Sequence, residues 1–209
     1  IAARALVLAD LWLHYRAAEN RAYDPRFASR LLELVDSYGQ LLSRHVLYTY
    51  RSNHGTMQNL VLMVLSLAFP ELGSASEWAD TAYRRLIEQA RYYIGPDGVI
   101  SEHSPGYQPF GIELIGSALR CMTLLGKPIP ADLAERFEQA KIYYAQLRRP
   151  DGTVPIIGDT DPSPTQADSP RRRPDGGYGP MEPFKTGKPD PVTLHPDGGI
   201  LIWWDGLES

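Results

Sequence analysis

The sequence has little of what marks membrane-spanning, disulfide-stabilised or nucleic-acid-binding proteins. Its 209 residues include a single cysteine, Cys121, so no disulfide can form within the chain. The longest apolar run, residues 60–69, has the length of a core helix and is too short to cross a membrane. The net charge of −4 and the pI of about 5.7 argue against nucleic acid or an anionic membrane as the main partner.

The sequence also lacks any evident motif for a metal or a nucleotide, so we predict no cofactor and assign no metal ligands. No secretion signal precedes the first helix-like stretch. The chain begins without Met inside a helical pattern and stops just after a strand-like run, so we expect it to be part of a longer protein. The missing signal therefore says nothing about export.

Helical periodicity dominates the part of the sequence before Pro150. Apolar side chains recur at helical spacing, which predicts helices at about residues 1–20, 26–49, 56–69, 77–94, 108–125 and 131–149. Asp24 and Pro25 form a start signal for the second helix, with Asp24 as its N-cap. The third helix is apolar on nearly all sides and is predicted to be buried. Cys121 lies in an apolar helical run, which indicates a buried thiol.

The composition changes after Pro150. Residues 151–190 are rich in Pro, Gly and Asp and are predicted to form an irregular linker. Residues 192–204 carry the pattern of a β-hairpin. We therefore predict a helical domain over residues 1–150, the linker, and the start of a β domain over residues 191–209.

The sequence Pro-Asp-Gly follows both the fourth and the sixth predicted helix, at residues 96–98 and 150–152. This faint repeat favours an array of helical hairpins, such as an α/α toroid, over a four-helix bundle. Pro-Asp-Gly is also a common turn sequence, which explains the recurrence equally well.

The first group of candidate site residues is Arg51-Ser52-Asn53-His54, at the start of the buried third helix. A helix N-terminus offers free backbone N–H groups and a partial positive charge. With an amide, an imidazole and a guanidinium added, the place suits a carboxylate. The alternative is structural: Ser52 or Asn53 caps the helix, and His54 is an ordinary first-turn residue.

The second group lies in the stretch SEHSPGYQPF, residues 101–110. It combines an acid, an imidazole, a hydroxyl and a phenol, from Glu102, His103, Ser104 and Tyr107. Two prolines and a glycine prevent a regular helix or a central strand through the stretch, so these groups are expected on a rigid loop at a helix end. The alternative is that they only form turns.

The two groups are predicted to converge, because the helices between them would form an antiparallel pair of matched length. A carboxylate-binding pair beside a phenol suits proton abstraction next to a carboxylate, as at carbon 5 of a uronic acid. Asn53 and His54 would neutralise the carboxylate and stabilise the enolate-like charge that develops. Tyr107 could then take the proton or give one to the leaving glycosidic oxygen.

The same residues carry a resemblance to a known family. Asn53-His54 stands at the start of an inner helix, and residues 97–107, DGVISEHSPGY, fit the pattern D-G-x-x-x-E-x-S-x-x-Y. Residues 157–161 and the final hairpin add weaker matches. In these features the chain resembles the heparinase II/III-like polysaccharide lyases, including related alginate lyases. The resemblance implies a mainly α fold: an incomplete α/α toroid of helical hairpins, followed by the first strands of an antiparallel β-sandwich.

The resemblance also implies roles for individual residues. Asn53 and His54 would bind the substrate carboxylate, and Tyr107 would be the general acid and, in a syn elimination, also the base. Further substrate contacts are expected from four residues: Arg51, Glu102, His103 and Gln108. Gln108 stands where the family often has His. The partner would be an acidic polysaccharide, and the location periplasmic or secreted.

Two other functions remain open from the sequence. Asp159 and Asp161 could be the paired carboxylates of a glycoside hydrolase on a similar helical barrel, or simply part of a turn. The chain could also belong to a polysaccharide-binding protein of an exopolysaccharide system that has lost catalysis. The basic run at residues 171–173 could contact a polyanion, although a solvated loop explains it as well. The oligomeric state is not predicted.

Overall fold

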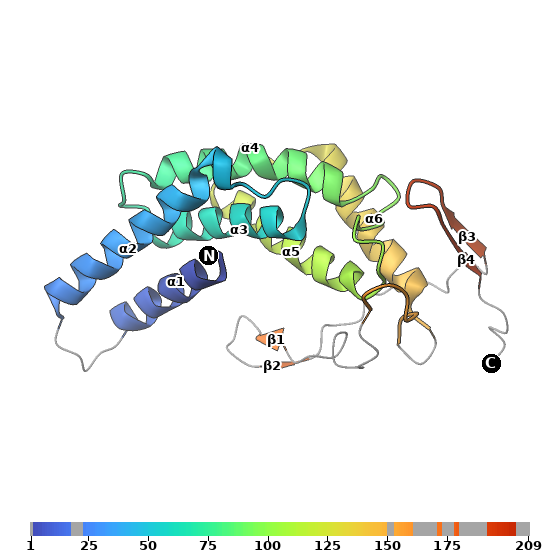
Figure 1. Ribbon diagram of the computed structural model, residues 1–209, viewed down its shortest axis with the longest axis horizontal. Coiled ribbons are helices and arrows are strands. Elements are labelled where there is room, and N and C mark those ends of the chain that lie inside the picture. Colours follow the sequence, from blue (N-terminus) through green and yellow to red (C-terminus); the bar gives the residue numbers. More distant parts are fainter. Residues whose placement is uncertain are drawn as a thin grey trace. The chain divides into compact units, whose positions relative to one another are not determined.

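The computed structural model describes residues 2–17, 23–149, 153–160, 171–172, 178–179 and 192–203. In this part of the chain the structure is mainly helical, which confirms the predicted fold class (Figure 1). The helices are α1 (Ala2–Ala17), α2 (Pro25–Ser43), the short 3₁₀ helix η1 (His45–Leu47), α3 (Asn53–Ala68), α4 (Ala75–Tyr93), α5 (Tyr107–Leu124) and α6 (Ala131–Leu147). The strands are β1 (Arg171–Arg172), β2 (Tyr178–Gly179), β3 (Val192–His195) and β4 (Ile200–Trp203).

The chain divides into two compact units, which are described separately. The first unit comprises Ile1–Ala90 and Leu114–Pro130, and the second comprises Arg91–Glu113 and Ala131–Ser209. Both α4 and α5 therefore contribute to each unit. The predicted boundaries at residues 150 and 190 stay a prediction, since most of the expected linker lies outside the described residues.

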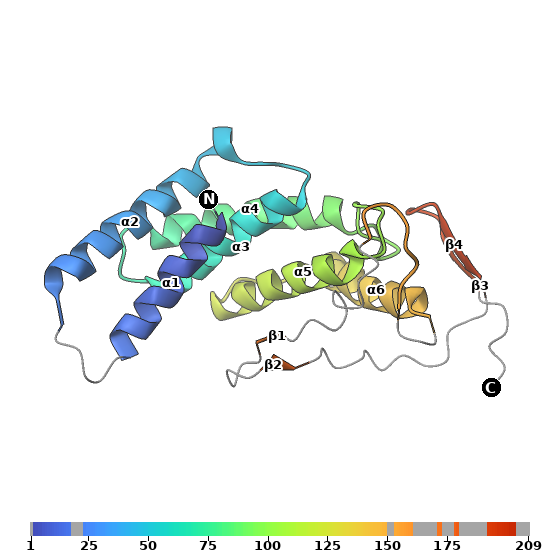
Figure 2. The same cartoon turned by 60° about the horizontal axis from the view of Figure 1, so that its bottom comes forward.

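The core of the first unit lies along α3. Val61, Leu62, Met63 and Leu65 are fully buried there, which confirms the expected burial of this helix. α1 and α2 pack against α3, and the two views in Figures 1 and 2 draw the three helices side by side. The apolar character of α3 on most sides is thus explained by neighbours on several sides.

The second helix begins as predicted but ends six residues early. Asp24 is its N-cap and its carboxylate accepts the backbone N–H of Arg26 at 2.9 Å, with Pro25 in the first turn. The helix stops at Ser43, whereas residue 49 was predicted. Arg85 of α4 donates to the carbonyl oxygens of Leu42 and Ser43, at 3.0 and 2.6 Å. These bonds satisfy the last carbonyls of α2, so the chain can leave the helix there.

The second unit contains the C-terminal hairpin. β3 and β4 pair antiparallel, with Val192 opposite Trp203 and His195 opposite Ile200, which confirms the predicted hairpin. Its buried residue Ile202 packs with Val99 before α5 and with residues of α6. β1 and β2 form a separate antiparallel pair.

The turn at residues 95–98 fastens this hairpin to the helices of the second unit. The carboxylate of Asp97 accepts the backbone N–H of Gly198 at 2.8 Å and that of Val99 at 3.3 Å. Gly98 has φ +85°, and an added Cβ would run into the backbone of Gln139 in α6. Only glycine allows this approach, so the Asp-Gly of the DGVISEHSPGY stretch is structural here.

Cys121 is buried at 8% exposure, as predicted, and burial raises the pKa of its thiol. Among the helices that the structure describes, none is long and apolar enough to cross a membrane.

Candidate functional site

The first candidate segment comprises residues 48–54 and is called the Asn-His segment here. Ser52 is the N-cap of α3: its hydroxyl accepts the N–H of Gly55 at 3.2 Å and donates to the carbonyl of Thr49 at 3.0 Å. Asn53 and His54 are consequently the first two residues of α3, with Asn53 half-buried and His54 exposed. Both lie at the helix N-terminus, as predicted, where an anion is favoured. The Ser52 cap and the first-turn position of His54 also agree with the structural alternative, and binding of a carboxylate here stays a prediction.

A buried glutamine on α4 holds this segment in place. Gln89 is 0% exposed, and its Oε1 accepts the backbone N–H of Arg51 at 2.9 Å and the hydroxyl of Tyr48 at 3.2 Å. Its Nε2 donates to the carbonyl of Ser52 at 2.8 Å. One side chain thus fixes the chain immediately before Asn53. The sequence does not point to Gln89, because one glutamine in an amphipathic helix carries no signal of burial.

The backbone at Arg51 depends on this support. Arg51 has φ 58°, in the left-handed region, which costs a non-glycine residue about 1–2 kcal/mol. The bond from its N–H to Gln89 offsets part of that cost. The Arg51 side chain is exposed, and its guanidinium lies 5.3 Å from the centre of the Tyr50 ring.

Tyr48 extends the network toward the core of the first unit. Its hydroxyl donates to Gln89 and accepts from Nδ2 of Asn59 at 3.1 Å. Asn59 is fully buried, and its Oδ1 has no hydrogen-bond partner among the described residues. Burial raises the pKa of Tyr48, so its phenol stays protonated and keeps donating. The Asn-His segment is therefore tied to buried side chains of both α3 and α4.

The second candidate segment comprises residues 97–108 and is called the Tyr107 segment here. Tyr107 is the first residue of α5, is half-buried, and has its ring edge-on to Phe110 with the ring centres 6.2 Å apart. Glu102 is half-buried and His103 is exposed. The φ of His103 is 51°, a left-handed conformation that turns the chain at this residue. The loop expected here is thus present, at the start of a helix.

Gln108 was predicted to contact substrate, but its side chain is buried and hydrogen-bonded to the protein's own backbone. It is 2% exposed, and its Oε1 accepts the N–H of Ile100 at 3.0 Å. Its Nε2 donates to the carbonyls of Gly98 and Ala140, at 2.8 and 3.1 Å. Because the protein's own backbone occupies these amide groups, Gln108 joins the Tyr107 segment to α6.

A further set of contacts to the Tyr107 segment comes from residues 157–160, part of the stretch 157–161 that weakly matches the family pattern. The hydroxyl of Thr160 accepts the N–H of Gly106 at 3.0 Å and lies 3.0 Å from the hydroxyl of Ser104. Ser104 also donates to the carbonyl of Ile157 at 3.0 Å. Asp159 is exposed, and Asp161 lies outside the described residues. This stretch therefore acts on the site through Thr160, a residue that the sequence analysis did not single out.

Tyr93, the last residue of α4, adds a buried phenol to the second unit. It is 1% exposed, and its hydroxyl has no hydrogen-bond partner among the described residues. Burial raises the pKa of Tyr93, and the nearby charges of Glu102 and Tyr107 act in the same direction. The phenol of Tyr93 therefore stays protonated.

The predicted residues fall into both units. Asn53, His54 and Arg51 belong to the first unit, whereas Tyr107 and its segment belong to the second. The convergence of the two groups stays a prediction. In the part of the chain that the structure describes, no cluster of three or more His, Cys, Asp or Glu residues could hold a metal ion.

Comparison with known proteins gives one family and one fold. Residues 8–170 match the family described as Heparinase II/III N-terminus. A crystal structure of heparinase III is similar with a TM-score of 0.62 and 21% identity, over 76% of this chain and 25% of that one. A heparinase III gene product with methylated lysines gives a TM-score of 0.57 and 22% identity, over 75% of this chain and 24% of that one.

The chain spans about a quarter of the length of these two structures. At this level of identity the likeness is one of fold. No curated protein matches the sequence.

Proposed function

The chain belongs to the heparinase II/III family, and from this premise we propose that its parent protein is a polysaccharide lyase. It cleaves a uronic-acid-containing polysaccharide by β-elimination. The observation that carries the proposal is the placement of Asn53 and His54 in the first turn of α3, behind a loop fixed by Gln89.

The Asn-His segment supplies the electrostatic part of the reaction. The amide of Asn53 and the imidazole of His54 offer hydrogen-bond donors at a helix N-terminus, where the helix dipole also favours negative charge. A uronate carboxylate held there is partly neutralised. The proton on carbon 5 then becomes more acidic, because the charge that develops on its removal is delocalised onto this carboxylate.

Tyr107 supplies the proton transfer. Its oxygen, when deprotonated, takes the proton from carbon 5, and the electron pair forms a double bond between carbons 4 and 5. The bond from carbon 4 to the glycosidic oxygen breaks, and the same phenol protonates the leaving oxygen in a syn elimination. The products are an unsaturated sugar and a new chain end, so protons and electrons balance without a co-reactant.

The remaining predicted residues take supporting roles in this proposal. The side chains of Arg51, Glu102 and His103 are exposed or half-buried and line the path of the polysaccharide. Gln108 positions the Tyr107 segment, since both its amide oxygen and its amide nitrogen are bonded to the backbone of this segment. The partner is an acidic polysaccharide, and the parent protein is periplasmic or secreted; both statements rest on the family.

The test uses the full-length protein with alginate and with heparan-, hyaluronan- and glucuronan-type polymers. Elimination produces an ultraviolet absorbance from the new double bond, and Tyr107→Phe is expected to lower its rate at least about 100-fold. Tyr23→Phe, at an exposed tyrosine, is the matched control and should keep full activity.

Two outcomes would contradict the proposal. New reducing ends without absorbance would identify a hydrolase. Binding to one polymer without any product would identify a non-catalytic polysaccharide-binding protein.

A further inference from the structure

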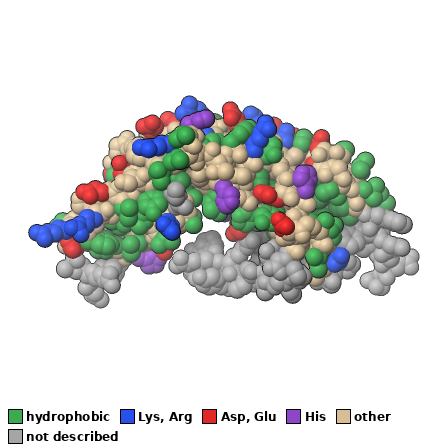
Figure 3. Space-filling model, viewed as in Figure 1, with side chains coloured by type: hydrophobic (Ala, Val, Ile, Leu, Met, Phe, Trp, Pro, Cys, Tyr) green, Lys and Arg blue, Asp and Glu red, His purple; other side chains and the backbone are tan. Residues whose placement is uncertain are grey.

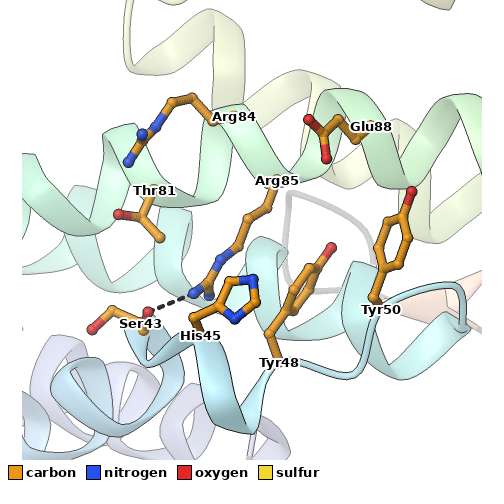
Figure 4. A pocket seen from close by; sticks show the side chains of 8 residues that line it. All are labelled: Ser43, His45, Tyr48, Tyr50, Thr81, Arg84, Arg85 and Glu88. Atoms are coloured by element: carbon orange, nitrogen blue, oxygen red, sulfur yellow. Dashed lines mark hydrogen bonds between the residues drawn. The ribbon is translucent and has the colours of Figure 1, made fainter.

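A cavity of about 630 Å³ opens in the first unit, whereas Tyr107, assigned above to proton transfer, belongs to the second. Its walls come from two segments: the stretch that follows α2, with His45, Tyr48 and Tyr50, and the α4 helix, with Arg84, Arg85 and Glu88. Figure 4 shows the two tyrosine rings rising from the first segment toward α4, with the Arg85 side chain reaching down between the two segments. The volume is within the range of small-molecule sites, about 300–1,000 Å³.

Two guanidinium groups line this cavity, one half-buried and held by hydrogen bonds and the other exposed. Arg85 is half-buried and fixed, since it donates to the last carbonyls of α2 and lies 4.6 Å from the centre of the Tyr48 ring. Burial lowers the pKa of Arg85, and the charge of Arg84 acts in the same direction. Arg84 is exposed, and its Nε makes a long bond of 3.4 Å to the carbonyl of Asp80.

The charge in the cavity is therefore not balanced from within. The ion pairs found among the described residues involve neither Arg84 nor Arg85. Glu88 is the one carboxylate among the lining residues, against two guanidinium groups. An anionic group bound here would relieve the repulsion between the two arginines.

This preference for an anion is local. On the face drawn in Figure 3, acidic and basic side chains are interspersed, and the described residues form no broad basic surface there. With a net charge of −4, the chain does not attract polyanions as a whole. Recognition of an acidic ligand must come from a shaped site that pairs its charge directly.

The aromatic side chains narrow the class of ligand. The rings of Tyr48 and Tyr50 are 6.1 Å apart at an angle of 44°, and Tyr50 is 46% exposed. An exposed tyrosine ring offers an apolar face and a polar tip, which matches the C–H face and hydroxyl groups of a sugar. Ser43 and Thr81 add hydroxyl groups at the wall. A guanidinium, an aromatic face and hydroxyls together fit a sugar that carries a negative group.

We propose that this cavity binds one acidic sugar unit of a polysaccharide, with Arg84 pairing its anionic group and Tyr50 packing against its ring. The site is additional to the carboxylate-binding pair Asn53 and His54. Only its substrate class rests on the proposed function. Tyr48 and Tyr50 belong to the Asn-His segment itself, so a sugar held here anchors the polymer beside that pair. The carboxylate of Glu88 accepts hydrogen bonds from sugar hydroxyls.

Binding is measured by titration calorimetry on the full-length protein carrying Tyr107→Phe, so that turnover does not interfere. The probe is a tetrasaccharide of glucuronic acid, and a glucose tetrasaccharide is its neutral counterpart. Arg84→Ala is expected to weaken binding of the acidic probe about 10-fold or more, the loss typical of a hydrogen bond to a charged group. Tyr50→Ala should also weaken it, whereas the exposed Arg30→Ala on α2 should not.

The outcomes separate this proposal from the proposed function. Unchanged affinity in both Arg84→Ala and Tyr50→Ala, with native circular dichroism, overturns the additional site even if the protein is a lyase. Equal binding of the neutral probe overturns its preference for an anion. If the affinity falls as expected but no polymer gives unsaturated product, the site stands and the lyase proposal fails. A sulfated tetrasaccharide in a parallel titration shows whether Arg84 prefers sulfate or carboxylate.

Discussion

The Asn-His segment and the Tyr107 segment are held in position by different arrangements of hydrogen bonds. Each places its reactive side chain in the first turn of a helix, and each relies on a buried glutamine, Gln89 or Gln108. Gln89 reaches the first segment from another helix and bonds to three of its residues. Gln108 belongs to the helix that it positions and shares the task with Thr160 and Asp97. The residues directly before Asn53 are thus held mainly by Gln89, with further bonds from Asn59 and Gln58 to Tyr48 and Thr49, whereas the Tyr107 segment is held by several residues.

This difference leads to unequal tolerance of mutation. A segment that depends mainly on one side chain loses most of its geometry when that side chain is removed. A segment held by several residues keeps more of its geometry when one bond is lost, because the remaining bonds still restrain it.

The largest effect is expected for Gln89→Leu. The change leaves the N–H of Arg51, the carbonyl of Ser52 and the hydroxyl of Tyr48 without their partner, which should lower the free energy of unfolding by about 1–3 kcal/mol. Lyase activity should fall about 100-fold, since even a small displacement of a binding group costs that much. Urea unfolding and the ultraviolet assay measure the two effects.

Two variants make this result specific. Gln89→Glu keeps the acceptor but replaces the donor to Ser52, so its activity should lie between those of wild type and Gln89→Leu. Gln40→Leu removes an exposed glutamine that bonds to Ser74 and should leave activity unchanged. Full activity in a destabilised Gln89→Leu protein would break the comparison, because the Asn-His segment would then keep its geometry without Gln89.

A smaller effect is expected for Thr160→Val, which removes one hydroxyl from the distributed set. The N–H of Gly106 and the hydroxyl of Ser104 lose a partner, for a cost of about 1–2 kcal/mol in unfolding free energy. Activity should fall by less than in Gln89→Leu, since Gln108 and Asp97 still hold the segment. Thr123→Val on the exposed face of α5 is the matched control. A loss of activity equal to that of Gln89→Leu would contradict the distributed arrangement.

The sequence was informative where local patterns decide the structure. Helical periodicity, the Asp24 cap and the hairpin pattern of residues 192–204 are local signals, and the structure has these elements at nearly the predicted positions. Asn53, His54 and Tyr107 were predicted to lie just before helices that start at about residues 56 and 108, and the structure places them in the first turns of those helices. The end of α2 was misjudged because it depends on Arg85, which is 42 residues away in the chain.

The sequence was uninformative where long-range hydrogen bonds decide the role of a residue. Gln108 stands in a motif of polar residues and was predicted to contact substrate, yet its amide is bonded to backbone as far away as Ala140. Gln89 and Thr160 carry no local sign of their partners in distant loops. A polar residue that positions a site and one that contacts substrate look alike until the fold shows which atoms are already bonded.

The smallest effect on stability is expected for Asp132→Asn. It contrasts an exposed ion pair with the buried hydrogen bonds of Gln89. Arg91 of α4 donates to both carboxylate oxygens of Asp132 in α6, at 2.7 and 2.9 Å, and this hydrogen bonding holds the pKa of Asp132 below its ordinary value. Because that pKa is lower in the folded state, the pair contributes stability above the unfolded value of about 3.9 and loses it as the pH falls through the folded value. Both side chains are about half exposed, so even the full contribution is small and is screened by salt.

Urea midpoints of wild type and Asp132→Asn should therefore differ slightly near neutral pH and converge at about pH 2. A difference that grows in acid would contradict this assignment, whereas Gln89→Leu, which removes no titrating group, should keep its full deficit in stability across the same range.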